Sequence, residues 1–405
     1  MNYNQWLILG NGFDLQAGLK STFVDFYKRR YNLNNLSNIN SINHNWEDNL
    51  LKNKQHSSVW DLLICTYLEN NFDSLQNWKD VESVIKEILQ GVHGTNVHFY
   101  ANIFQDAAKV IPISWQFREM IHGDSTLDND EKHALRDYWL CYYIIEKLVH
   151  SYPYFKDYVS EKTDLDDTEN FILNLSDVRS ILSPLLLKEL KKFESAFSEY
   201  LDEQILSDTG YVLNAKKLYK IIADDPIIST QVLSFNYTPK ISNDILIYRN
   251  IHGSLKDKNI IFGIDASDNE NGQGFDPYLV KFTKTSRILK LTNNSISNIK
   301  EDWNSQYVDQ ITIYGHSLGE ADYSYFQSIF DSVNLYQSFT KLIFAYSIYD
   351  SDKSEEIETT YETAVEKLMT RYGQSFTNQS HGRNLLHKLL LEGRIQIQLI
   401  KPEIE

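Results

Sequence analysis

The sequence predicts an α/β fold, with a Rossmann-like, mostly parallel sheet and a large helical insertion. Three observations support this prediction. A short apolar run and a glycine-containing turn open the chain, a helical block follows, and short β-rich runs alternate with helices after about residue 214. We therefore expect one domain formed by residues 1–44 and 206–405, interrupted by an inserted helical subdomain over residues 45–205.

The first unit of the chain has the pattern of a strand, a turn and a helix. Residues 6–10 are a short apolar run typical of a buried strand. After the turn, "STFVDFYKRRYNL" predicts a helix, with Ser21 or Thr22 as its N-cap.

The middle block is predicted to be helical because apolar residues recur there at three- and four-residue spacing. This spacing places them on one face of a helix. The stretches that carry it are "SVWDLLICTYLENN", "DVESVIKEIL", "KHALRDYWLCYYIIEKLVHSY" and "SPLLLKELKKFESAFSEYLDEQI".

The last part of the chain alternates between the two kinds of pattern, which is typical of a parallel sheet covered by helices. Its predicted helices include "SEEIETTYETAVEKLMTRYG" and "NLLHKLLL". Its predicted strands are "TQVLSF", "DILIYRNI", "NIIFGI", "DQITIYG", "KLIFAYSI" and "RIQIQLI".

Composition narrows the class of protein. The net charge of -16 argues against a protein that mainly coats nucleic acid, since such binding depends on Lys and Arg. The two cysteines, Cys65 and Cys141, exclude a disulfide framework and cannot alone form a zinc site, so we expect no metal. The sequence shows neither a secretion signal nor a membrane-spanning run, and we expect a cytoplasmic protein without membrane contact.

Polar and glycine residues directly after predicted strands are the first candidates for a site, because ligands bind at the carboxyl ends of parallel strands. Four strand ends carry such residues. They are Gly10, Asn11 and Gly12 after the first strand, Asn236 after "VLSF", His252 and Gly253 after "YRNI", and Gly315, His316 and Ser317 after "ITIY".

The opening glycines have two interpretations. Gly10 and Gly12 allow backbone amides to approach a pyrophosphate, or they serve only the geometry of a strand-to-helix turn. The usual dinucleotide fingerprint has a third glycine at position 15, which is Leu15 here, and the next glycine is Gly18. Both interpretations stay open on this pattern alone.

The "GHSLG" motif after a predicted strand is also the pattern of a serine-hydrolase nucleophile elbow. In that alternative Ser317 is the nucleophile, Asp350 the acid, and His381 or His387 the base. Acidic residues rather than a helix of small residues follow the motif, and no upstream "HGGG" oxyanion loop occurs. These features disfavour the hydrolase alternative.

Other candidates also have structural interpretations. His252 can be a turn histidine bonded to backbone, and Asn236 can cap a strand end. In "NWKDVESVI" Asp80 can be a helix N-cap behind Trp78, with Glu82 in the first turn, and we favour a structural role for all three.

Together these motifs resemble the AbiH family, bacterial abortive-infection proteins of phage defence. The matching segments run in order from about residue 6 to 326. They are "LGNGFDLQAGLKSTFVDF", "NWKDVE", "KKFESAFSEYL", "SFNYT", "IHGSL", "IIFGI" and "YGHSLGEADYSYF".

A more distant resemblance is to sirtuin-like NAD-consuming domains, and it implies a nucleotide-binding Rossmann-like fold. Gly10, Gly12 and Gly18 keep the spacing of the first sirtuin loop, and Asn236 matches a "T-x-N" strand end. The catalytic "H-G" of those domains matches His252 and Gly253, and a late "G-x-S-x-x-D" is similar to Gly315, Ser317 and the more distant Asp322. Asp14 stands where the first sirtuin loop has a serine. The cysteines that bind zinc in sirtuins are absent, which argues against protein deacetylation as the activity.

This resemblance implies cleavage of NAD or a related nucleotide at the ribose–nicotinamide bond. Asn236 is expected to orient a water or a ribose hydroxyl, and His252 to act as general base. The groups expected to bind the nucleotide are Gly10, Asn11 and Gly12 at the pyrophosphate, Ser317 at a phosphate or ribose, and Asp14 at a ribose hydroxyl, unless Asp14 repels phosphate. Further residues expected to bind the nucleotide are Gly18, Gly253, Gly315 and Asp322.

The leading hypothesis is therefore an NAD glycohydrolase that acts as a toxic effector during phage infection. Its expected partners are a nucleotide and a phage-derived activator. A homo-oligomer, formed with further copies of the chain, is a further option. The alternatives are a serine hydrolase using Ser317 and a nucleotide-sensing or nuclease-type effector.

Overall fold

A computed structural model describes residues 4–30, 58–61, 63–64, 81–90, 175–208, 210–223, 229–264, 279–292, 308–319 and 322–401. The chain divides into two compact units. The first comprises Met1–Phe26, Phe197–Ile261 and Ile288–Glu405, and the second comprises Tyr27–Ala196 and Phe262–Arg287. The predicted insertion over residues 45–205 stays a prediction, because most of it lies outside the described residues.

The first unit contains a six-stranded sheet in which every neighbouring pair of strands is parallel. The strand order is β3-β2-β1-β4-β5-β6. The chain fills one side of β1 first and then crosses to the other, so the switch point lies between β1 and β4. The predicted Rossmann-like α/β class is confirmed. The strands are β1 (Asn4–Leu9), β2 (Ser229–Ser234), β3 (Ile247–Asn250), β4 (Gln310–Tyr314), β5 (Lys341–Tyr346) and β6 (Ile395–Leu399).

Alternation along the central strand explains why the sheet is buried on both faces. In β1, Trp6 and Ile8 pack into one hydrophobic core, while Leu7 and Leu9 pack into the other. Successive side chains of a strand point to opposite faces, so an unbroken apolar run is what a doubly covered strand requires.

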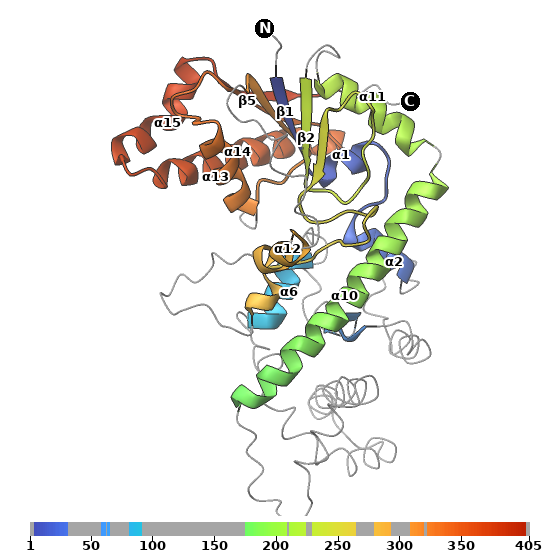
Figure 1. The fold of residues 1–405 in the computed structure, drawn as a ribbon. Coiled ribbons are helices and arrows are strands. Elements are labelled where there is room, and N and C mark those ends of the chain that lie inside the picture. Colours follow the sequence, from blue (N-terminus) through green and yellow to red (C-terminus); the bar gives the residue numbers. More distant parts are fainter. Residues whose placement is uncertain are drawn as a thin grey trace, which may run out of the picture. The chain divides into compact units, whose positions relative to one another are not determined.

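Helices of the first unit form a layer on each face of the sheet (Figure 1). One layer packs on the core that contains Trp6 and Ile8, and its helices are α13 (Tyr323–Ser332), α14 (Ser354–Gln374) and α15 (Gln379–Leu391). The other packs on the core of Leu7 and Leu9, and its helices are α1 (Asn11–Gln16) and α11 (Tyr211–Ala223). A short 3₁₀ turn, η5 (Ser351–Lys353), precedes α14.

The remaining described elements are helices of the second unit and three helices, α2, α10 and α12, that continue from one unit into the other. They are α2 (Phe23–Arg30), α6 (Val81–Gln90), α10 (Leu175–Ser207), η2 (Val280–Phe282) and α12 (Lys284–Thr292). The predicted N-cap of the first of these is confirmed at Thr22, whose Oγ1 accepts a hydrogen bond of 3.0 Å from the Asp25 amide.

Two local predictions are wrong. The segment between the first strand and the helix predicted at "STFVDFYKRRYNL" is not simply a turn, because it contains α1, which begins directly at Asn11. The run "NIIFGI" forms no strand of the sheet and makes only an isolated bridge between Ile264 and Thr283. Carboxylates of the second unit accept the amide hydrogens of Phe262 and Gly263, which a strand ladder would otherwise use.

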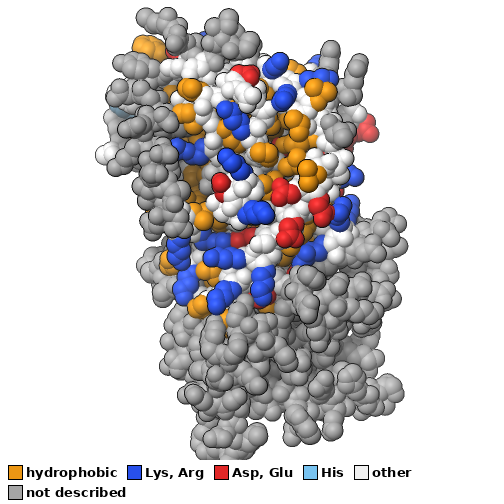
Figure 2. All heavy atoms as spheres, turned by 45° about the vertical axis from the view of Figure 1, so that its right-hand side comes forward, with side chains coloured by type: hydrophobic (Ala, Val, Ile, Leu, Met, Phe, Trp, Pro, Cys, Tyr) orange, Lys and Arg blue, Asp and Glu red, His pale blue; other side chains and the backbone are white. Residues whose placement is uncertain are grey.

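Surface composition differs from what the net charge alone suggests. The face shown in Figure 2 carries basic, acidic and hydrophobic side chains close together. Within the described residues, no helix is long and apolar enough to span a bilayer.

Candidate functional site at the carboxyl end of the sheet

The carboxyl ends of β1 to β4 bring together residues from distant parts of the sequence. The Asn236 side chain, after β2, donates a hydrogen bond of 3.0 Å from Nδ2 to the carbonyl oxygen of Gly10, after β1. His252 follows β3, and His316 follows β4. These residues lie beside the switch point between β1 and β4, where parallel α/β folds place their ligands.

The opening glycines serve close packing of two turns. The Gly12 amide donates to the Gly315 carbonyl at 2.8 Å, and the Gly10 amide donates to the Tyr314 carbonyl at 3.0 Å. A Cβ at Gly10 would lie 2.5 Å from the Cα of His316, so only glycine fits there. Both amides predicted to hold a pyrophosphate are thus engaged within the protein, and their role as a phosphate cradle stays a prediction.

The later glycines permit backbone angles that other residues avoid. Gly315 has φ 68° and Gly253 has φ 90°. A Cβ at Gly253 would lie 2.1 Å from the carbonyl oxygen of Asn259, so glycine is required to close this turn beside His252. Gly18, with φ 100°, follows the end of α1 and supplies the same freedom there.

Asp14 is buried on α1 and accepts hydrogen bonds from two protein hydroxyls. The Tyr211 hydroxyl donates to Oδ1 at 2.7 Å, and the Thr238 hydroxyl donates to Oδ2 at 3.1 Å. Burial raises the pKa of the Asp14 carboxyl to about 7, although both hydroxyls favour the ionised form. These contacts give Asp14 a place in the packing of α1 on α11, and its predicted contact with a ribose stays a prediction. The neighbouring Asn11 likewise accepts from Ser21 Oγ, at 2.6 Å.

The Asn236 carboxamide is held in one orientation. Its Nδ2 donates to Gly10, and its backbone carbonyl accepts a hydrogen bond of 2.7 Å from Asn250 Nδ2. Within the described part of the chain, Oδ1 of Asn236 accepts no hydrogen bond. The carbonyl end of this side chain is therefore the end that can orient a water or a hydroxyl.

Three side chains form a group that we call the histidine–aspartate cluster: His252, His316 and Asp322. Asp322 lies just before α13, and its Oδ1 is 3.6 Å from His252 Nε2 while its Oδ2 is 3.4 Å from His316 Nε2. The other nitrogen of His316, Nδ1, accepts a hydrogen bond of 2.9 Å from the Leu318 amide. Both imidazoles are almost completely buried.

Aromatic rings surround the cluster and hold the imidazole planes. The Phe235 ring lies edge-on to both histidines, with centroids 5.4 Å from His252 and 4.5 Å from His316. Tyr325 packs against His252 and Phe326 against His316. An imidazole in such surroundings is oriented by packing as well as by hydrogen bonds.

The geometry gives little support to the serine-hydrolase alternative. Ser317 is exposed. Among the residues of "GHSLG" other than glycine, Leu318 has the strained backbone angle, with φ 56°. In a nucleophile elbow the strained turn centres on the serine itself. Within the described residues, Ser317 makes no hydrogen bond to Asp350, His381 or His387.

His316 is the member of the cluster to which the sequence assigned no role. The sequence placed it at a strand end but gave it no function, while Asp322 was predicted to bind a nucleotide. The available signal was a histidine directly after a buried strand and six positions before an aspartate. Its contact with Asp322 became visible only with the turn that places both near His252.

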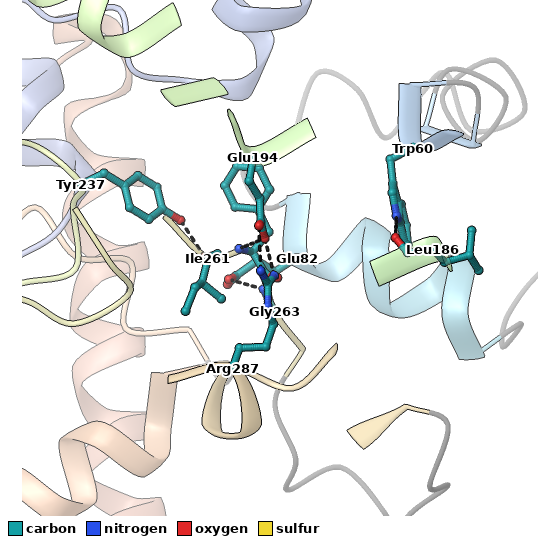
Figure 3. Close-up of polar contacts among 9 residues, drawn as sticks. Trp60, Glu82, Leu186, Glu194, Tyr237, Ile261, Gly263 and Arg287 are labelled. Atoms are coloured by element: carbon teal, nitrogen blue, oxygen red, sulfur yellow. Dashed lines mark hydrogen bonds and ion pairs between the residues drawn. The ribbon is translucent and has the colours of Figure 1, made fainter. Parts of the chain in front are cut away.

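A second polar group lies in the second unit, and we call it the carboxylate clamp: Glu82, Glu194, Lys284 and Arg287. Figure 3 shows Glu194 and Glu82 beside Gly263 and Arg287. Glu194 accepts the Phe262 amide at 2.8 Å and pairs with Arg287, whose Nη2 lies 2.7 Å from Oε2.

The Glu82 half of the clamp repeats this arrangement one residue further along the chain. Glu82 accepts the Gly263 amide at 3.1 Å and pairs with Lys284 at 2.6 Å. Burial raises the pKa of the Glu194 carboxyl, and Arg287 partly offsets that effect. The clamp fixes the backbone of "IIFGI" and assigns Glu82 a structural contact; Trp78 and Asp80 lie outside the described residues.

The fold and this site define a Rossmann-like α/β protein with a histidine–aspartate cluster at the switch point of its sheet. Over residues 6–346 the sequence matches the family described as bacteriophage abortive infection AbiH, and the chain belongs to that family. The predicted AbiH membership is confirmed, whereas the sirtuin resemblance stays a prediction. Searches of curated proteins and of solved structures found no match.

Proposed function

We propose that this AbiH protein is an abortive-infection effector that hydrolyses NAD or a related nucleotide at the carboxyl end of its sheet. Family membership indicates the role in phage defence. The convergence of Asn236, His252 and Asp322 at the switch point is the observation that supports a nucleotide enzyme. The proposal includes a cytoplasmic location, where NAD is available, and release of activity by a phage-derived component.

The proposed reaction breaks the bond between C1′ of the ribose and the nicotinamide nitrogen. The bonding pair leaves with the nicotinamide, which becomes neutral, and a water oxygen forms a new bond to C1′. The water proton passes to His252, and the products are nicotinamide and ADP-ribose. Asn236 Oδ1 orients the water, because Nδ2 of that side chain is engaged by Gly10.

The burial of the site suits this chemistry. His252 is 4% exposed and Asn236 is 5% exposed, so bulk water has little access to the groups that would position one reacting water. A general base in such a position typically contributes ~10²–10⁴-fold to the rate.

The test follows NAD and nicotinamide in cells that carry the wild type or a variant, before and during phage infection. We expect the wild type to deplete NAD and release nicotinamide, and His252→Ala to reduce that turnover by ~10²–10⁴-fold. Lys217→Ala, on the exposed side of α11, is the matched control and should behave like the wild type.

Three results would overturn the proposal. Cell death with unchanged NAD rejects it, and cleavage of RNA or DNA under those conditions supports a nuclease-type effector instead. Labelling of Ser317 by a fluorophosphonate, with esterase activity, supports the hydrolase alternative.

A further inference from the structure

We infer that Asp322 and His316 are positioning residues for His252, with Asp322 placed between the two imidazoles. This inference rests on the proposed function, because it concerns how His252 is prepared to accept a proton. It assigns His316, which the sequence left without a role, and changes the role of Asp322 from nucleotide contact to partner of the base.

The Leu318 amide fixes the tautomer of His316. It donates a hydrogen bond to Nδ1 at 2.9 Å, and a ring nitrogen that accepts such a bond carries no proton. The neutral ring therefore carries its proton on Nε2. That nitrogen is the one that lies 3.4 Å from Asp322 Oδ2.

The strained backbone of the turn supports a specific role for this contact. Leu318 has φ 56°, an angle that a leucine adopts only where the surrounding structure requires it. Strain of this kind is concentrated at functional sites. Here the strained residue is the one whose amide orients His316.

Asp322 presents its two oxygens to different histidines. Its Oδ2 faces the Nε2–H of His316, and its Oδ1 lies 3.6 Å from His252 Nε2. When His252 accepts a proton, the carboxylate is placed to stabilise the new positive charge, as an acid does for the histidine of a triad. Catalytic hydrogen bonds are often long before substrate binds, and separations of 3.4 and 3.6 Å fit that behaviour.

The kinetic test compares kcat and KM for NAD in the wild type and in Asp322→Asn, with protein purified from phage-infected cells. We expect Asp322→Asn to lower kcat by ~10–100-fold with KM changed less than about twofold. The reason is that His252 loses the carboxylate beside it, whereas the contacts that bind the substrate are kept. Asp352→Asn, an exposed change in η5, is the matched control and should match the wild type.

A pair of substitutions at position 316 separates positioning from packing. His316→Gln keeps a donor near Asp322, whereas His316→Asn keeps only the acceptor for the Leu318 amide. We expect His316→Asn to lower kcat about tenfold or more and His316→Gln to retain most of the activity. Equal losses in both variants would indicate that the imidazole serves packing alone.

A direct measurement does not depend on activity. In protein labelled with ¹⁵N-histidine, we expect His316 to show the Nε2–H tautomer, with the signal assigned by its loss in His316→Gln. An Nδ1–H tautomer would overturn the inference. Wild-type turnover that is unchanged in Asp322→Asn overturns the inference alone, whereas no nicotinamide release by the wild type overturns the proposed function and this inference with it.

Discussion

The histidine–aspartate cluster and the carboxylate clamp are both largely buried groups of ionisable side chains, but they differ in how closely their members approach. In the clamp, Glu194 and Glu82 accept backbone amides at 2.8 and 3.1 Å, and each has a cationic partner at hydrogen-bond distance. In the cluster, the two oxygens of Asp322 lie 3.4 and 3.6 Å from the imidazole nitrogens.

On the proposed function, this difference separates a structural polar group, the clamp, from a group that takes part in the reaction, the cluster. The clamp carboxylates accept hydrogen bonds from two consecutive amides and pair with two cations. They therefore fix the backbone at Phe262 and Gly263. The cluster lies at strand ends, and its separations allow tightening when a ligand or a proton arrives. Breaking the clamp should therefore cost stability, while breaking the cluster should cost turnover.

The largest expected effect on stability comes from removing one partner of the clamp. Arg287→Met leaves Glu194 buried without its guanidinium, a change that typically lowers the free energy of unfolding by about 3–5 kcal/mol. Denaturant unfolding followed by circular dichroism measures the loss. Lys290→Met, on the exposed side of the same helix, is the control and should change stability by less than about 0.5 kcal/mol.

The double variant Glu194→Met with Arg287→Met sharpens this result. We expect it to lose less stability than the sum of the two single changes, because no uncompensated charge is left. Additive losses would mean that the pair does not act as a unit.

A smaller loss of stability is expected from the turn that carries the cluster. A Cβ at Gly315 would lie 2.4 Å from the Phe13 amide nitrogen, and the φ of 68° is itself unfavourable for alanine. Gly315→Ala should lower the free energy of unfolding by about 3 kcal/mol, from overpacking and backbone strain together.

Gly319 provides the comparison within the same motif. Among the described residues, a Cβ there would meet Ser317 Oγ alone, at 3.5 Å, which is an ordinary contact. Gly319→Ala should therefore change stability by less than about 1 kcal/mol. Equal effects at the two glycines would show that the close packing of the β1 and β4 turns is not what requires glycine.

The fold was predictable because each strand of a buried parallel sheet needs a contiguous apolar run, and such runs can be recognised locally in the sequence. Five of the six predicted strand runs after residue 214 contain strands, and the continuous apolar run at the start of the chain became the doubly covered β1. The exception, "NIIFGI", has the composition of a strand. Its amides bind Glu82 and Glu194, which lie 181 and 68 positions away, and no local pattern announces such partners.

The candidate site was predictable only in part. Strand ends identified Asn236 and His252, because parallel strands share one carboxyl edge. The hydrogen-bond partners and the tautomers of the site residues could not be predicted from the sequence. The engagement of the Gly10 and Gly12 amides depends on Tyr314 and Gly315, and the tautomer of His316 depends on one backbone amide in a strained turn.

Asp14 extends the comparison to the pH dependence of stability. Like Glu194 it is a buried carboxyl, but hydroxyls rather than a guanidinium face it. Its pKa is 3.8 in ordinary surroundings and rises to about 7 on burial. Between those values the folded protein binds one more proton than the unfolded chain, so this carboxyl makes the free energy of unfolding fall as pH rises.

Asp14→Asn should remove that contribution, because the amide does not ionise. Between pH 5 and pH 8 the shift corresponds to roughly 2–3 kcal/mol of wild-type stability, and most of it is lost by pH 7. Denaturant unfolding at several pH values compares the two slopes, with Glu355→Gln, an exposed acid of α14, as the control that should keep the wild-type slope. Parallel pH profiles for the wild type and Asp14→Asn would show that this carboxyl keeps its charge in the folded protein, and would leave burial without the expected electrostatic cost at that position.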